Sequence, residues 1–179
     1  KACHDMDLMA WYVDSKCTRV SSFGVQNTFI QMNKPKGVPA RCGEHCPHAK
    51  SCLYEVNKLY KQEKAQHLAK IIVNEYGSLE KGFEVSDYCR CVYDLDNDVM
   101  ETQVTLLEFE NGVHVSFHLC AFTDEISRYM HIMGTEGEIR CNTLDRKITV
   151  KRYDEKEERI IQIGESDSLH EGGDAGIIK

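Results

Sequence analysis

The chain has 179 residues, which is enough for one domain with a hydrophobic core of its own. Hydrophobic residues make up 41% and charged residues 28% of the sequence, a balance typical of a soluble, globular protein. The formal net charge of −7 argues against a nucleic-acid-binding surface, which usually carries a basic stripe. No apolar run of about 18 residues occurs, so the sequence offers no candidate membrane-spanning helix.

The chain contains nine cysteines, which is a large number for its length. A chain that can build its own core does not need a disulfide scaffold, and an odd count leaves at least one thiol unpaired. We therefore expect reduced cysteines, some packed and some binding metal, and a cytoplasmic location. Four of them stand among apolar or strand-forming residues and are expected to be buried: Cys3, Cys17, Cys120 and Cys141.

The first element in the chain is a predicted helix over residues 4–14. Apolar residues recur along it at helical spacing, at Met6, Met9, Ala10 and Val13. His4 and Asp7 lie on the opposite stripe, one turn apart. A carboxylate beside an imidazole raises the pKa of the imidazole and orients the ring, which suits acid–base catalysis. The alternative is an ordinary helix start, in which acidic residues complement the helix dipole.

The next elements are a strand-like stretch over residues 17–30 and a long loop over residues 33–52, which holds all three prolines. The loop also holds Cys42, Cys46 and Cys52, whose short spacings allow one loop to wrap a tetrahedral metal ion. The candidate fourth ligands are His45, His48, Cys89 and Cys91. We favour Cys91, because it would attach the loop to a strand, and we expect a structural zinc. Free thiols, a disulfide formed after purification, or an iron–sulfur cluster are the alternatives.

The rest of the chain begins with a helical pattern over residues 53–76, which Gly77 is expected to end. A short apolar stretch over residues 89–93 reads as a strand. Three predicted hairpins then follow: residues 101–109 with 113–122 around the Asn111-Gly112 turn, 127–133 with 138–142, and 146–153 with 158–163. Helices followed by hairpins predict a single α+β domain over residues 1–179, with a large, mainly antiparallel open sheet.

The tail contains a second polar pair, His170 and Asp174, on either side of Gly172-Gly173. Glycines let a backbone approach a ligand closely, although an ordinary flexible loop explains the same pattern.

Four separated segments resemble one known family. "HDMDLMAWYVDSKCTRVSSFG", "TLLEFENGVHVSFHLCAF", "IMGTEGEIR" and "HEGGDAGI" are similar, in this order, to segments of the C-terminal domain of Gfo/Idh/MocA-family oxidoreductases. The resemblance covers nearly the whole chain. It implies an α/β domain with a large open sheet, which follows a Rossmann domain that binds NAD or NADP. Neither the G-x-G-x-x-G fingerprint nor the Glu-Lys-Pro element of the family occurs here, so the usual dinucleotide site is not expected in this chain. We expect a chain truncated at both ends, because it starts at Lys1 and stops at Lys179, where a helix could be starting.

The resemblance also implies a function. His4 would exchange the proton of a sugar or polyol hydroxyl, and Asp7 would orient His4 or bind a neighbouring hydroxyl. His170 and Asp174 would line the substrate side of the cleft. The family further implies a homo-oligomer formed through the sheet face, with no nucleic-acid or membrane partner. The fragment alone is expected to be inactive. The alternative is a non-catalytic, metal-stabilised binding or assembly module with the same fold.

Overall fold

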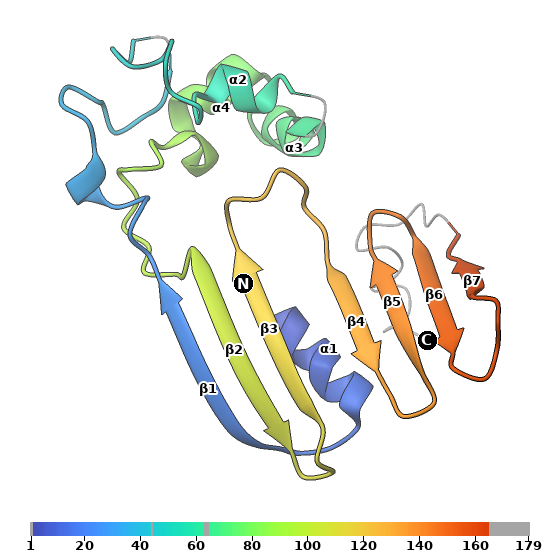
Figure 1. The fold of residues 1–179 in the computed structure, drawn as a ribbon. Coiled ribbons are helices and arrows are strands. Elements are labelled where there is room, and N and C mark those ends of the chain that lie inside the picture. Colours follow the sequence, from blue (N-terminus) through green and yellow to red (C-terminus); the bar gives the residue numbers. More distant parts are fainter. Residues whose placement is uncertain (1, 44, 63–64, 165–179) are drawn as a thin grey trace. The chain divides into compact units, whose positions relative to one another are not determined.

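The structure, a computed structural model, describes residues 2–43, 45–62 and 65–164 (Figure 1). The helices are α1 (Cys3–Val13), α2 (Val56–Tyr60), α3 (Gln66–Tyr76) and α4 (Leu79–Val85), with 3-10 turns η1 (Gln31–Asn33) and η3 (Asp87–Cys89). The strands are β1 (Cys17–Val25), β2 (Thr102–Phe109), β3 (His114–Cys120), β4 (Tyr129–Met133), β5 (Gly137–Asn142), β6 (Lys147–Arg152) and β7 (Arg159–Gln162). The predicted α+β class and antiparallel pairing are confirmed. The chain divides into two compact units, and the boundary between them in the sequence lies between Phe122 and Thr123.

The first unit contains an antiparallel sheet with the order β1-β2-β3. The predicted hairpin around Asn111 and Gly112 is confirmed, and Gly112 takes a φ of 82°, a left-handed conformation that favours glycine. Burial alternates along β2, because successive side chains of a strand point to opposite faces. Thr105, Leu107 and Phe109 are buried, whereas Val104 and Leu106 are exposed on the open face.

Helix α1 forms where the apolar spacing predicts it. Met6, Met9 and Val13 are half-buried, and Trp11 on the other stripe is 72% exposed. Asn111 ties the end of the helix to the hairpin turn, because its side-chain amide donates to the Val13 carbonyl at 3.2 Å. None of the described helices is long and apolar enough to cross a lipid bilayer.

The predicted helical pattern over residues 53–76 is divided into α2 and α3. Helix α2 ends at Tyr60, where the polar Lys61 and Gln62 follow, and α3 begins at Gln66. Gly77 ends α3 with a φ of 84°, as predicted. Helices α2, α3 and α4 pack around a core cluster of Val56, Tyr60, Ile72 and Cys89.

Two strand predictions were wrong in extent. Residues 89–93 form only the end of η3 and a single antiparallel bridge between Arg41 and Arg90, because their partner is an irregular loop segment that follows Pro39. β1 ends at Val25 rather than at residue 30. The amides of residues 27–29 donate to the carboxylate of Glu101 instead of to a neighbouring strand.

The expected burial of four cysteines was also wrong. Cys3 and Cys120 are exposed, and Cys17 and Cys141 are half-buried. Cys3 lies in the first turn of α1, and Cys120 lies on the open face of the sheet. Apolar neighbours in sequence do not bury a strand residue, since those neighbours point to the other face.

The second unit is an antiparallel sheet with the order β4-β5-β6-β7. Both of its predicted hairpins are confirmed. Gly137 allows β5 to approach β6 closely, because a Cβ at this position would lie 2.3 Å from the Lys151 carbonyl oxygen.

The contact between α3 and α4 gives a first prediction. A Cβ on Gly82 would lie 2.0 Å from Cγ2 of Ile72, which is buried in the core. We expect Gly82→Ala to destabilise the chain by about 1–3 kcal/mol despite the higher helix propensity of alanine, since overpacking displaces a core side chain. Urea unfolding measures the effect, with the exposed α4 variant Glu84→Ala as the control. Equal stability of Gly82→Ala and wild type would contradict the contact.

Candidate functional site

The predicted acid–base pair lies on α1. His4 and Asp7 are both exposed, and their separation of three residues places them on the same side of the helix. The pair is therefore free to meet a bound molecule. The second predicted pair, His170 and Asp174, lies outside the described residues, so its position relative to α1 stays a prediction.

The four cysteines predicted as metal ligands come together around one pocket in the first unit. Cys42, Cys46, Cys52 and Cys91 all line a pocket of about 250 Å³, which we call the thiol pocket. Three of these residues are half-buried, namely Cys42, Cys46 and Cys52, and Cys91 is buried. In the described part of the chain, no three His, Cys, Asp or Glu side chains are close enough together to hold an ion as they stand.

The bridge between Arg41 and Arg90 positions two of these thiols. The Cys42 amide donates to the Cys89 carbonyl at 3.0 Å, and the Cys91 amide donates to the Ala40 carbonyl at 2.8 Å. Cys89 and Cys91 stand on either side of the bridge residue Arg90 in the sequence, and Cys89 is fully buried in the core of the helices. Of the two, only Cys91 lines the pocket.

The other two thiols sit on a loop that Lys58 fastens to α2. The Lys58 ammonium donates to the carbonyls of Ala49, Lys50 and Cys52 at 2.9, 2.7 and 2.8 Å. Glu55 caps the same helix by accepting from the Lys58 amide at 3.1 Å. The loop is thus held to a packed helix at the position of Cys52.

Burial affects the acidity of two of the pocket thiols and of two neighbouring core residues. Burial raises the pKa of Cys42 and of Cys91, and it raises the pKa of the neighbouring core residues Cys89 and Tyr60 to about 11 and about 12. The Cys42 sulfur does receive one amide, from Val56 at 3.4 Å.

One histidine also lines the thiol pocket. Nε2 of His48 lies 3.2 Å from the Lys36 carbonyl oxygen, and a carbonyl can only accept, so Nε2 carries the proton of this bond. Nδ1 then keeps its lone pair in the neutral ring. His48 is therefore a rival to Cys91 as a ligand. His45 does not line this pocket.

An aromatic cluster contributes two rings, Tyr54 and Tyr93, to the lining of the thiol pocket. The Phe29 ring lies 4.9 Å from Tyr54, 5.9 Å from Tyr93 and 5.5 Å from Phe122, measured between ring centroids. This cluster was not foreseen, because the four rings come from separate loops and show no common spacing in the sequence.

Glu101 anchors that cluster to the sheet. Its carboxylate accepts the backbone amides of Asn27, Thr28 and Phe29 at 3.2, 2.9 and 2.5 Å. Glu101 directly precedes β2, so the clamp connects the chain after β1 to the central strand. Burial favours the neutral acid, but the three donated amides outweigh it and hold the pKa of Glu101 below its usual range.

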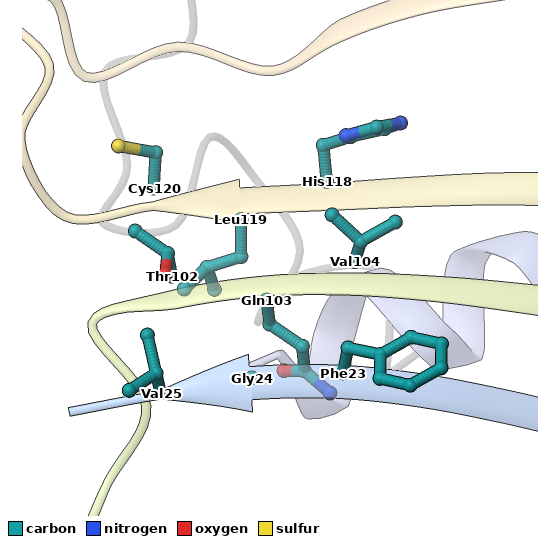
Figure 2. A pocket seen from close by; sticks show the side chains of 9 residues that line it. All are labelled: Phe23, Gly24, Val25, Thr102, Gln103, Val104, His118, Leu119 and Cys120. Carbon is teal, nitrogen blue, oxygen red and sulfur yellow. The ribbon is translucent and has the colours of Figure 1, made fainter.

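A second, shallower hollow of about 430 Å³ lies on the open face of β1-β2-β3. Figure 2 shows His118 and Cys120 projecting to the same side from β3. Phe23, Val104 and His118 form one cross-strand row, and Val25, Thr102 and Cys120 form the next. The lining is mainly apolar and lacks a carboxylate beside the imidazole, so the hollow suits packing against another surface better than catalysis.

The chain is similar to a curated protein of Bacillus subtilis (strain 168) named "Putative oxidoreductase YteT". The two are 22% identical over 189 residues, an alignment that covers 97% of this chain and 43% of the relative. The chain thus spans less than half the length of that relative. No family model and no solved structure matches the sequence. The likeness supports an oxidoreductase and goes no further.

The Glu101 clamp gives a pH-dependent prediction. A carboxylate whose pKa is lowered by folding contributes stability above its unfolded pKa of about 4.3, and this contribution is lost as the pH falls through the lower folded pKa. We expect Glu101→Gln to lower the melting temperature by several degrees at pH 7. The difference from wild type should shrink as the pH falls below about 4. Thermal unfolding followed by circular dichroism measures it, with Glu84→Gln as control. A difference that does not change with pH would contradict the clamp.

Proposed function

We propose that this chain is the substrate-binding and proton-transferring part of an NAD(P)-dependent oxidoreductase that acts on a sugar or polyol hydroxyl. One observation carries the proposal: the chain aligns over 97% of its length with part of a protein named as an oxidoreductase. The exposed His4 and Asp7, on the first helix, supply the residue types that the proposed chemistry needs. The free thiols of this chain favour a cytoplasmic location for the protein.

In the proposed reaction a ring nitrogen of His4 accepts the hydroxyl proton while the alcohol carbon becomes a carbonyl carbon. Asp7, one turn along α1, favours the protonated imidazole and orients the ring. His170 and Asp174 are proposed to bind neighbouring hydroxyl groups. The nicotinamide would accept the hydride, but this chain has no G-x-G-x-x-G fingerprint to bind a dinucleotide. We therefore assign this chain only to substrate binding and proton transfer.

The proposal is tested in the intact protein that contains this chain. His4→Ala should lower kcat by roughly 100- to 10,000-fold, the usual contribution of a general base, and should leave dinucleotide affinity unchanged. His67→Ala, an exposed histidine of α3, is the matched control. Turnover and nucleotide binding are measured separately with a panel of sugars and polyols. Unchanged turnover in His4→Ala would favour the alternative, a non-catalytic binding or assembly module.

We also propose that the open face of β1-β2-β3 pairs with a second copy of the chain. Large apolar side chains lie exposed there, with Phe23 at 76% and Leu106 at 55% exposure. A face of this kind is costly to leave in water, and covering it by a symmetric copy buries the same residues twice. Ser116 and the imidazoles of β3 would then lie at the same interface.

The pairing is tested by a charge on the open face. We expect Leu106→Glu to convert a dimer or larger assembly into monomers, because two carboxylates would be buried in a symmetric interface. Val20→Glu, an exposed position on the opposite side of the same sheet, is the control. Light scattering after size-exclusion chromatography measures the mass. A wild-type chain that is already monomeric, or an assembly unaffected by Leu106→Glu, would contradict the proposal.

A further inference from the structure

We propose that Cys42, Cys46, Cys52 and Cys91 bind one zinc ion as four thiolates, forming a structural centre in the first unit. This inference is independent of the proposed oxidoreductase function. It concerns a pocket that shares no residue with His4, Asp7 or the open face of the sheet.

The first argument is convergence from three chain segments. The thiols come from the residues after the Arg41 bridge, from the loop held by Lys58, and from the segment after η3, yet all four line the same pocket of about 250 Å³. Cys91 is separated from Cys52 by three helices. Cys89 points into the core instead, so the fold itself selects Cys91 from the two nearby cysteines.

The second argument is the chemistry around the sulfurs. The Val56 amide already donates to the Cys42 sulfur, and such bonds stabilise thiolates bound to metal.

The third argument concerns how the site closes. A zinc–sulfur distance of about 2.3 Å places the sulfurs of a tetrahedral centre about 3.8 Å apart. The thiols are not gathered that closely in the structure, so binding must draw them inward. Cys42 and Cys91 are held by the two backbone bonds of the bridge, Cys52 lies in the loop that Lys58 holds to α2, and Cys46 lies on a turn closed by local backbone bonds. Closure therefore proceeds by movement of the loop side chains toward the bridged pair.

Four protein ligands fill the coordination sphere of zinc, which is the pattern of a structural rather than a catalytic ion. The centre would connect the long loop to the segment after η3, close to the aromatic cluster around Phe29. Its role is then to hold a proline-containing loop that has little regular structure of its own.

The metal itself is tested on the chain purified without oxygen. We expect one zinc ion per chain, a fall in melting temperature after removal of zinc by a chelator, and recovery on addition of zinc. Cobalt substituted for zinc should give the intense near-ultraviolet absorption of thiolate ligands. Zinc should protect the four named cysteines from alkylation, as mapped by mass spectrometry, while the exposed Cys3 of α1 reacts freely. Iron with acid-labile sulfide in place of zinc, or equal alkylation with and without zinc, would overturn the proposal.

The ligand set is tested by single substitutions. Cys42→Ser, Cys46→Ser, Cys52→Ser and Cys91→Ser should each weaken zinc binding by more than about 100-fold, beyond the usual effect of residues outside the coordination sphere. The half-buried Cys141→Ser and the pocket residue His48→Ala are the controls and should bind zinc normally. Circular dichroism confirms that each variant is folded, and the cobalt spectrum reports the number of thiolates. Loss of binding in His48→Ala together with normal binding in Cys91→Ser would overturn the assignment of Cys91. None of these measurements depends on turnover.

Discussion

The arrangement of the first unit depends on one antiparallel bridge, between Arg41 and Arg90. Its two backbone hydrogen bonds bring a loop segment and the end of η3 together, although the two are separated by three helices in the chain. The bridge also sorts the cysteines, because it directs Cys89 into the core of α2, α3 and α4 and leaves Cys42 and Cys91 at the pocket. The bridge therefore places Cys42 and Cys91 at the pocket, beside the packed helices.

A second constraint joins this region to the sheet. Glu101 accepts three consecutive amides after β1 and stands at the start of β2, so the backbone leaves the sheet at a defined angle and carries Phe29 to the aromatic cluster. The ionised carboxylate of Glu101 accepts backbone amides that would pair with a neighbouring strand if β1 were longer. The chain segment beside the pocket is therefore attached to the sheet by hydrogen bonds, and their strength depends on the charge of Glu101.

Much of the fold could be predicted because its signals are local. The hairpin around Asn111 and Gly112, the end of α3 at Gly77 and the helix that carries His4 each follow from turn chemistry or apolar spacing within a few residues. The failures involve partners distant in sequence. The sequence of residues 27–29 predicts a strand, but their amides bind the carboxylate of Glu101, which is distant in sequence. The sequence around Cys120 predicts burial, but Cys120 lies on the exposed face of the sheet. The short spacings of Cys42, Cys46 and Cys52 predict metal ligands, which stays a prediction, and these three residues line one pocket with Cys91. The aromatic rings come from four separate loops and show no common spacing in the sequence.

The three hydrogen bonds of the Lys58 ammonium restrict which residue can replace lysine at this position. Three carbonyl oxygens from one loop converge on a single nitrogen at 2.7–2.9 Å, which uses every proton that an ammonium group carries. The flat, forked guanidinium of arginine spreads its donors over three nitrogens and cannot meet three oxygens at one point. Acetylation would leave one donor in place of three. Replacement of Lys58 by arginine would therefore keep the charge but lose the hydrogen-bond geometry, so only lysine fits the three carbonyls of this loop.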